Sequence, residues 1–453
     1  EREREITAFI PQEYWTVDGV FATMRDAAIF EGKLHALDGK TLDKMAIKTK
    51  DEAEKIVAEI AKKPFTVTHV ESKERKASPP PPFTTSTLQQ DANRRLGFSA
   101  KQTMTLAQKL YEGIELGSEG AVGLITYMRT DSVSLADKFV GDSAAFITME
   151  FGGAYALASP RRYKTKSKGA QEAHEAIRPT DPKRMPENVA PFLDPHMLKL
   201  YQLIWQRALA TQMPDAKLLG TSADLTCGRA LFRATGQRVT FDGYLKLYPD
   251  QDKDKYLPEL QQNETVTASS IQATQHFTEP AARYSDATLV KALEENGIGR
   301  PSTYAPTIST IIDRDYVERD EKKRLAPTTV GIEVTDLLVK EFPNIVDYEF
   351  TSRMELSLDK IAEGEMDWRP LLEAFYGPFH MQLQAKEKEL DKEQLELAKG
   401  VTCETCGSPM AVKRSRYGKF LACTRYPECK GTKTLPGEKA RAAPEPTDEK
   451  CPT

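Results

Sequence analysis

The sequence contains few cysteines and no long hydrophobic run. Only six of its 453 residues are cysteine, which is too few for a disulfide scaffold in a chain of this length. No stretch approaches the roughly 18 consecutive apolar residues that a membrane-spanning helix needs, and none resembles a secretory signal peptide. We therefore expect a protein of the cell interior without a membrane span.

The sequence also lacks an excess of charge of either sign. Its 67 acidic and 63 basic residues give a net charge of −4. The average charge thus predicts no nucleic-acid partner, and such a partner has to be inferred from local patches. Hydrophobic residues make up 40% and charged residues 29% of the chain, as in ordinary globular proteins. At roughly 150 residues per domain, the length predicts about three domains.

Four of the six cysteines lie close together near the C-terminal end. The spacing C-x2-C-x16-C-x5-C is formed by Cys403, Cys406, Cys423 and Cys429. Four thiolates on two short knuckles can hold a tetrahedral Zn²⁺ ion, and a module of about 35 residues needs such an ion because its own core is small. We predict a structural zinc ribbon at 400–435; the alternatives are a redox-active pair and a chance cluster.

Basic and aromatic side chains lie between these cysteines. Residues 401–434 contain seven bases and two acids. Arg416, Tyr417 and Phe420 combine cations for phosphates with rings for stacked bases, which favours binding of a nucleic-acid strand. The alternative is a ribbon whose charges are merely solvated. Residues 436–453 form a linker rich in Pro, Ala, Glu and Lys, and its ending CPT resembles the first knuckle of a second ribbon.

An apolar stretch leads directly into a group of reactive side chains. Residues 121–128 predict a buried strand, which contains Tyr127 and is followed by Arg129. A tyrosine hydroxyl has a pKa of about 10, so it needs neighbouring positive charge to act as a nucleophile. Arg129 lies on the same face if the strand continues. The chain has 16 tyrosines, so a structural role for Tyr127 is the alternative.

A second basic patch follows. Residues 159–179 contain six bases and two acids, and Arg161, Arg162 and Lys164 suit a phosphate backbone. The alternative is a solvated loop. His174 does not belong to a zinc protease motif, because no second histidine follows at the required spacing.

Periodicity divides the rest of the chain into helical and β-rich parts. Apolar residues at helical spacing predict a helix over 51–62, and Asp194 before Pro195 predicts the start of another. Alternating β-branched, aromatic and polar residues predict a β-rich segment over 216–280, and a glycine-rich turn at 297–302 lies between two predicted helices.

Five motifs together identify a family. They are FTTSTLQQ at 83–90, ITYMRTDS at 125–132, AHEAIRP at 173–179, GIGRPSTYA at 297–305 and the four-cysteine ribbon. In this order they closely resemble bacterial type IA DNA topoisomerases, and the resemblance spans essentially the whole chain.

The resemblance implies a mechanism. Tyr127 would attack a phosphodiester of single-stranded DNA, forming a 5′-phosphotyrosyl link, and another strand would pass through the gap before religation, without ATP. Arg129 would stabilise charge on the scissile phosphate, and His174 would support the site and the phosphate. Arg178 and Arg300 would bind the DNA backbone.

The resemblance also implies a multidomain α+β fold. The family core is a torus of winged-helix-like helical domains and a β-rich strap, followed by the zinc ribbon. The expected parts are 1–10, the end of a helical domain; 11–83 and 216–280, the two halves of the strap; 84–215, the helical domain that carries Tyr127; 281–395, a winged-helix-like domain; 400–435, the ribbon; and 436–453, the linker and start of a second ribbon.

The family carries an N-terminal Toprim domain whose carboxylates bind Mg²⁺. This sequence begins after that domain, so we expect a fragment, with structural Zn²⁺ in the ribbon and catalytic Mg²⁺ in the parent enzyme. The acidic residues at 250–254 are expected to form only a solvated loop. The implied partners are single-stranded and negatively supercoiled DNA, with RNA polymerase contacting the C-terminal ribbons.

The implied protein is a monomer at the nucleoid, in the bacterial cytoplasm. The alternative to an incomplete isomerase is a single-stranded DNA-binding module without catalytic activity of its own.

Overall fold

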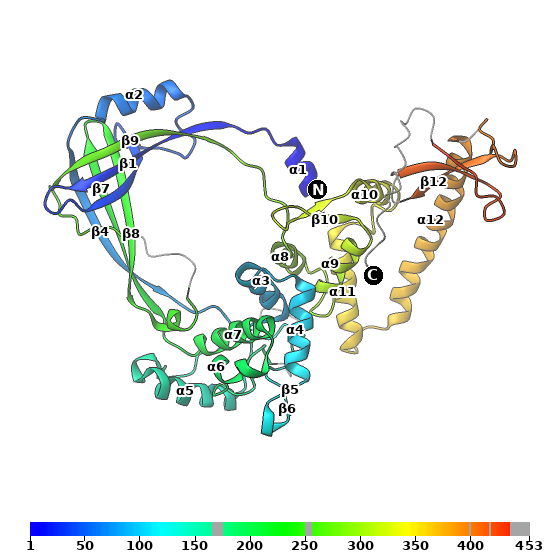
Figure 1. Cartoon of the computed structure of the whole chain (residues 1–453), viewed down its shortest axis with the longest axis horizontal. Coiled ribbons are helices and arrows are strands. Elements are labelled where there is room, and N and C mark those ends of the chain that lie inside the picture. Colours follow the sequence, from blue (N-terminus) through cyan, green and yellow to red (C-terminus); the bar gives the residue numbers. More distant parts are fainter. Residues whose placement is uncertain (165–174, 250–255, 398–399, 416–417, 435–453) are drawn as a thin grey trace, which may run out of the picture. The chain divides into compact units, whose positions relative to one another are not determined.

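A computed structural model describes residues 1–164, 175–249, 256–397, 400–415 and 418–434 (Figure 1). The chain forms two compact units, Glu1–Thr328 and Thr329–Thr453. Their boundary falls inside the range 281–395 that we expected to be one domain. The reason is that residues 286–313, in the first part of this range, pack on the helices of residues 85–112, which belong to the first unit.

An antiparallel sheet of seven strands is built from two separated stretches of the first unit. The strand order is β1-β9-β4-β7-β8-β2-β3, and β1 also pairs with β2, so the sheet closes on itself. The strands are β1 Glu13–Thr23, β2 Ile29–Leu37, β3 Lys40–Thr41, β4 Phe65–Ala77, β7 Ala216–Cys227, β8 Ala230–Phe241 and β9 Thr265–Phe277.

Aromatic rings fill the inside of this sheet. Phe21 contacts Phe65 and Phe232 edge-to-face, with ring centroids 5.0 and 5.6 Å apart. The Phe21 ring lies over Gly19, where a Cβ atom would be 2.6 Å from it. Helix α2, Lys50–Ile60, packs its apolar face on the same core and confirms the helix predicted over 51–62.

The helical body, residues 84–215, follows the first half of the sheet. Its helices are α3 Thr85–Leu96, α4 Ala100–Glu112, α5 Asp137–Phe151, α6 Pro186–Val189 and α7 Pro195–Ala210. It also contains the short strands β5 Ile114–Glu115 and β6 Ala121–Val122 and the 3₁₀ turns η1 Gly117–Glu119, η2 Gly153–Tyr155 and η3 Ala190–Phe192. The Asp194 side chain caps α7 as predicted.

A buried arginine ties the sheet to the helical body. The Arg207 side chain on α7 donates from Nε to the Pro81 carbonyl at 2.7 Å and from Nη1 to the Tyr248 hydroxyl at 2.9 Å. Pro81 follows β4, and Tyr248 follows the 3₁₀ turn η4, Gly243–Lys246. Burial raises the pKa of Tyr248 to about 12, which keeps its hydroxyl protonated. Arg207 therefore joins the β4–α3 connection and the β8–β9 connection at one point.

The α8–β11 segment, residues 285–328, completes the first unit. It contains α8 Asp286–Glu295, α9 Tyr304–Asp313, β10 Val317–Arg319 and β11 Leu325–Pro327. The N-terminal helix α1, Arg2–Ala8, packs beside it through an ion pair between Glu3 and Arg283 at 2.6 Å.

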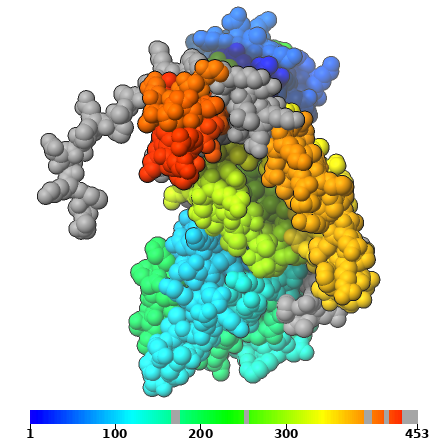
Figure 2. All heavy atoms as spheres, turned by 90° about the vertical axis from the view of Figure 1, so that its right-hand side faces the viewer, coloured from blue at the N-terminus to red at the C-terminus, as the bar shows by residue number. Residues whose placement is uncertain are grey.

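The helical body and the α8–β11 segment are linked in two ways, covalently through the sheet and by direct contact. Along the chain, every covalent connection between the helical body and the α8–β11 segment passes through strands of the sheet. The two parts also meet directly, α3 against α8 and α4 against α9. In the space-filling view the yellow-green α8–β11 segment lies directly against cyan residues of the helical body (Figure 2). This direct contact is non-covalent.

In its described residues, the second unit contains three helices and a small sheet. The elements are α10 Thr329–Glu341, α11 Tyr348–Ala362, α12 Trp368–Leu397, β12 Met410–Ser415, β13 Gly418–Cys423 and β14 Thr432–Lys433. Among the described residues, no helix has the length and apolar character that a membrane span requires.

The aromatic core of the sheet should account for much of its stability. We expect Phe232→Ala to lower the free energy of unfolding by about 3–5 kcal/mol, because it leaves a cavity between Phe21 and Phe65. The control is Phe277→Ala, which removes a half-exposed ring and should cost at most about 0.5 kcal/mol. Urea denaturation followed by tryptophan fluorescence measures both; equal losses would contradict this role of the core.

Candidate active site and zinc centre

The segment that carries Tyr127 is a turn and not the strand predicted over 121–128. Only β6 and a single bridge between Ile125 and Pro179 are extended. Gly123 lies close to the end of α4, where a Cβ atom would be 2.8 Å from the carbonyl oxygen of Tyr111. The alternation of burial nevertheless persists: Tyr127 is 43% exposed and Arg129 is exposed, whereas Met128 between them is 1% exposed. Both reactive side chains therefore face outward.

Thr85, the first residue of α3, holds this turn in place. Its backbone N–H donates to the Thr130 carbonyl at 2.8 Å, and its hydroxyl donates to the Met128 carbonyl at 2.7 Å. In return, the Thr130 N–H donates to the Thr85 hydroxyl at 2.9 Å. Thr85 is fully buried, so these bonds are shielded from water and fix the backbone on both sides of Arg129.

A third segment binds the other end of the turn. The Thr126 N–H donates to the Arg178 carbonyl at 2.9 Å, and the Thr126 hydroxyl donates to the Ala176 carbonyl at 2.7 Å. Ile177 in turn donates to the Phe83 carbonyl at 2.8 Å. Three sequence motifs, at 83–90, 125–132 and 173–179, are thus joined by backbone hydrogen bonds around the segment that carries Tyr127.

Tyr127 and Arg129 line a pocket of about 770 Å³. One wall is a face of α4, and the opposite wall is the turn at 301–302 with the first half of α9. The lining residues are Lys101, Met104, Thr105, Gln108, Lys109, Tyr127, Arg129, Pro301, Ser302, Ala305, Pro306 and Ser309. Three of them are basic and none is acidic, so the pocket suits an anionic ligand.

A second tyrosine supports the first. The Tyr111 ring, at the end of α4, contacts the Tyr127 ring edge-to-face with centroids 5.3 Å apart. This contact restricts the Tyr127 side chain without hiding it from solvent.

The basic run at 161–164 is partly neutralised by acids that are distant in sequence. Arg161 pairs with Asp215 at 2.7 Å, and Arg162 pairs with Asp137. Lys164 is exposed. Arg161 and Arg162 thus each have an acidic partner in the helical body, and binding of a phosphate backbone by this run stays a prediction.

Arg178 and Arg300 have different surroundings. The Arg178 side chain is 12% exposed; it donates to Glu175 at 2.7 Å and lies over the Phe139 ring. The contact with Phe139 joins the 173–179 motif to α5. Arg300 donates to the carbonyl of its neighbour Gly299, in the turn that precedes the pocket wall. His174 lies outside the described residues.

Sequence reasoning missed four residues of this site: Thr85, Lys101, Lys109 and Tyr111. Thr85 belongs to the motif at 83–90, to which the sequence assigned no function. Lys101 and Lys109 are eight positions apart and so share one face of α4, but only the folded chain shows that this face lines the Tyr127 pocket.

The four cysteines of the ribbon form a zinc centre. Their sulfur atoms all lie within 4.8 Å of one another, with 3.7 Å between Cys403 and Cys429 and 3.3 Å between Cys406 and Cys423. A tetrahedral Zn²⁺ site with Zn–S bonds of about 2.3 Å places sulfurs about 3.8 Å apart, so the group fits. A hydrogen bond from the Ser408 side chain lowers the pKa of the Cys406 thiol to about 6.

Of the DNA contacts predicted in the ribbon, Phe420 lies in the described part of the sheet β12-β13-β14. Phe420 lies in β13 opposite Lys413, which places a ring and a cation side by side. Arg416, Tyr417, the acidic run at 250–254 and the whole of 436–453 lie outside the described residues.

The zinc centre requires a glycine at position 431. A Cβ atom there would overlap the Cys403 sulfur and lie 3.7 Å from the Cys429 sulfur. We expect Gly431→Ala to lower zinc affinity about 10- to 100-fold, as disturbance next to metal ligands commonly does. Competition with a chromogenic chelator measures this, with Thr432→Ala as the neighbouring control; full zinc retention by Gly431→Ala would contradict the geometry.

Comparison with known proteins supports the same assignment. Residues 1–373 match the family described as DNA topoisomerase, and residues 400–438 match the topoisomerase DNA-binding C4 zinc finger. The chain is 45% identical to DNA topoisomerase 1 of Campylobacter jejuni over 97% of its own length and 62% of that protein. It thus spans less than two thirds of this relative.

A solved structure shares the fold. The structure of full-length topoisomerase I from Thermotoga maritima matches 96% of this chain and 68% of that chain, with a TM-score of 0.74 and 32% identity. On this evidence the chain belongs to the type IA DNA topoisomerase family, with a topoisomerase zinc ribbon at its C-terminal end.

Proposed function

We propose that this chain carries the nucleophile of an enzyme that relaxes negatively supercoiled DNA without ATP, through a 5′-phosphotyrosyl intermediate. The observation that supports it most is the position of Tyr127: an exposed hydroxyl on a turn held by buried hydrogen bonds, in a basic pocket beside Arg129. Rigid placement of a nucleophile next to a charge that can stabilise the reacting phosphate is what phosphoryl transfer requires.

The proposed step conserves atoms and bond energy. The Tyr127 hydroxyl loses its proton and its oxygen bonds to phosphorus, while the bond from phosphorus to the 3′ oxygen breaks and that oxygen takes up a proton. The phosphotyrosyl bond replaces the phosphodiester bond, so the free 3′ hydroxyl can reverse the reaction. Arg129 stabilises negative charge on the phosphate oxygens during both steps.

The pocket itself supplies no Mg²⁺ site. Its lining contains no carboxylate, and the only group of three or more metal-ligating side chains among the described residues is the cysteine set. We propose that Mg²⁺ acts in the parent enzyme, where the carboxylates of a Toprim domain would hold it, as the resemblance implies.

The ribbon is proposed to bind single-stranded DNA. Phe420 and Lys413 on adjacent strands offer one stacking surface and one phosphate contact. Zn²⁺ holds these strands together and takes no part in the chemistry. We further propose, because the resemblance implies it, that the enzyme is a monomer and that its ribbon contacts RNA polymerase.

The second candidate function is a single-stranded DNA-binding module without its own catalytic activity. The absence of carboxylates from the described Tyr127 pocket favours it for the isolated chain. Plasmid relaxation with Mg²⁺ distinguishes the two: relaxation by the isolated chain would exclude the module, whereas salt-sensitive oligonucleotide binding without relaxation would favour it.

Tyr127→Phe tests the nucleophile directly. In the full-length gene product we expect this variant to lose covalent capture of a single-stranded oligonucleotide by at least about 1,000-fold, because no oxygen remains to bond phosphorus. Non-covalent binding should stay within about twofold. Denaturing gel electrophoresis measures capture, and Tyr111→Phe is the matched control, since it removes a hydroxyl from the adjoining ring and should capture normally. Persistent capture by Tyr127→Phe would refute the assignment.

Lys101 and Lys109 test the path of the DNA strand. Replacing either with alanine should weaken oligonucleotide binding and reduce the slope of log affinity against log salt by about 0.7, the value for one lost phosphate contact on a single strand. Fluorescence anisotropy at several salt concentrations gives the slope. Lys138→Ala on α5, outside the pocket, is the control; equal slopes for all variants would place the strand elsewhere.

A further inference from the structure

A second pocket lies where the sheet joins the helical body. It has a volume of about 290 Å³ and is formed by α3, α7 and the η4 turn with the residues that follow it. Helices α3 and α7 lie side by side at this end of the sheet (Figure 1). Among the described residues, this pocket shares no lining residue with the Tyr127 pocket.

The lining of this second pocket is strongly basic. Arg94 and Arg95 come from the last turn of α3, and Arg207 comes from α7. Asp91, one turn before Arg95, is the only acid among the described lining residues. Three positive charges and one negative charge leave a net charge of +2 in the pocket. Such a pocket favours an anionic ligand.

The single carboxylate is already shared. One oxygen of Asp91 accepts from the Tyr248 hydroxyl and from Arg207 Nη1, the latter at 3.3 Å. Arg95 Nε lies 3.6 Å from the same oxygen. One negative charge thus serves two guanidinium groups that are both largely buried. Because like charges repel each other more strongly where water is excluded, a bound anion would stabilise this cluster.

Aromatic rings hold the guanidinium groups in place. Arg95 lies over the Tyr248 ring at 4.2 Å, and Arg207 lies over the Phe83 ring at 4.6 Å. A stacked guanidinium group still presents its N–H donors along its edge. Arg95 Nη1 donates to the Pro249 carbonyl at 3.0 Å. No acceptor among the described residues bonds Nη2 of Arg95 or Nη2 of Arg207, so both can serve a ligand.

Arg94 and Gln90 add further donors. Arg94 Nη2 donates to the Gln90 side-chain oxygen at 3.1 Å. The Gln90 side chain is nearly buried, and its amide nitrogen has no acceptor among the described residues. The donors in this pocket therefore outnumber the acceptors. A phosphate group suits such a set, because its oxygen atoms accept several charge-assisted hydrogen bonds at once.

We propose that this pocket binds a small phosphorylated molecule, whose phosphate group is held by Arg94, Arg95 and Arg207. Its volume lies at the lower end of the range for small-molecule sites and is well below the 770 Å³ of the Tyr127 pocket. This size favours a small ligand over a nucleic-acid strand. The bound ligand contacts α3, α7 and the β8–β9 connection together, and the proposal does not rest on the reaction at Tyr127.

Isothermal titration of the chain with inorganic pyrophosphate tests the site, because this probe carries phosphate groups without a sugar or base. We expect saturable binding that Arg94→Gln and Arg95→Gln each weaken about tenfold or more, since each removes a hydrogen bond from a charged donor. Arg238→Gln, at an exposed position of β8, is the matched control and should stay within twofold.

Two results of this titration would overturn the proposal: no binding by the unmodified chain, or unchanged affinity in the Arg94 variant. Arg94 is exposed, so Arg94→Gln remains a valid test even if Arg95→Gln fails to fold.

Hydrogen exchange locates the bound probe. Saturating pyrophosphate should slow exchange at least about threefold in peptides covering 90–96 and 242–248, because a ligand that binds only the folded junction suppresses its local opening. Peptides covering 124–130, around Tyr127, should be unchanged. Slower exchange at 124–130 without any change at the junction would place the anion in the Tyr127 pocket and contradict the proposal.

A single-stranded oligonucleotide distinguishes a small phosphate from a phosphate of DNA. We expect pyrophosphate to bind with the same affinity, within twofold, when the chain is saturated with the oligonucleotide. A tenfold or greater loss of pyrophosphate affinity would assign the pocket to the DNA strand and overturn the proposal of a small ligand. If the chain binds no oligonucleotide, the proposed function is weakened, and the pyrophosphate titration still decides the site.

Discussion

The placement of Tyr127 depends on the hydrogen bonds between Thr85 and the backbone of Met128 and Thr130. A turn lacks the regular backbone hydrogen bonds of a helix or a sheet. Its buried N–H and C=O groups therefore need hydrogen-bond partners from other segments of the chain. Thr85 provides them from the first turn of α3, which is itself fixed by a capping box at Thr84. As a result, the proposed nucleophile is exposed on a backbone that is held in place by buried hydrogen bonds.

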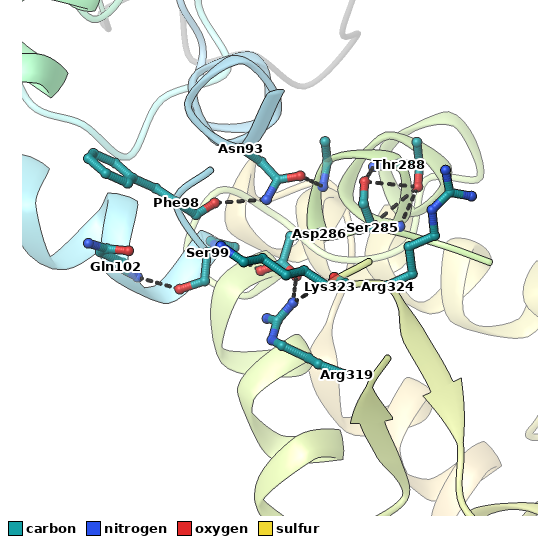
Figure 3. Close-up of polar contacts among 12 residues, drawn as sticks. Asn93, Phe98, Ser99, Gln102, Ser285, Asp286, Thr288, Arg319, Lys323 and Arg324 are labelled. Carbon is teal, nitrogen blue, oxygen red and sulfur yellow. Dashed lines mark hydrogen bonds and ion pairs between the residues drawn. The ribbon is translucent and has the colours of Figure 1, made fainter. Parts of the chain in front are cut away.

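This rigidity applies to one side of the pocket only. The other wall comes from the α8–β11 segment, which the chain reaches only through the sheet. This segment meets the helical body through hydrogen bonds from the Ala100 N–H to Asp286 and from the Ala287 N–H to Asn93 (Figure 3), and through a small apolar contact. On the other side of the helical body, Arg207 holds the connections that follow β4 and β8.

Sequence patterns predicted the features that are determined locally. The apolar face of α2, the Asp194 cap and the cysteine spacing each depend on residues close together in the chain. The strand predicted over 121–128 was wrong because hydrophobic periodicity does not register the close approach of Gly123 to Tyr111. For the same reason the sequence did not reveal that Arg161 pairs with Asp215, or that a face of α4 lines the pocket: these contacts join distant residues.

The central claim is that Tyr127 forms the covalent bond to DNA. The most direct test is to trap the full-length gene product on a single-stranded oligonucleotide with Mg²⁺, digest the complex with a protease and locate the adduct by mass spectrometry. The account predicts a nucleotide joined through its 5′ phosphate to Tyr127. An adduct on Tyr111 or any other residue, or attachment through a 3′ phosphate, would contradict it.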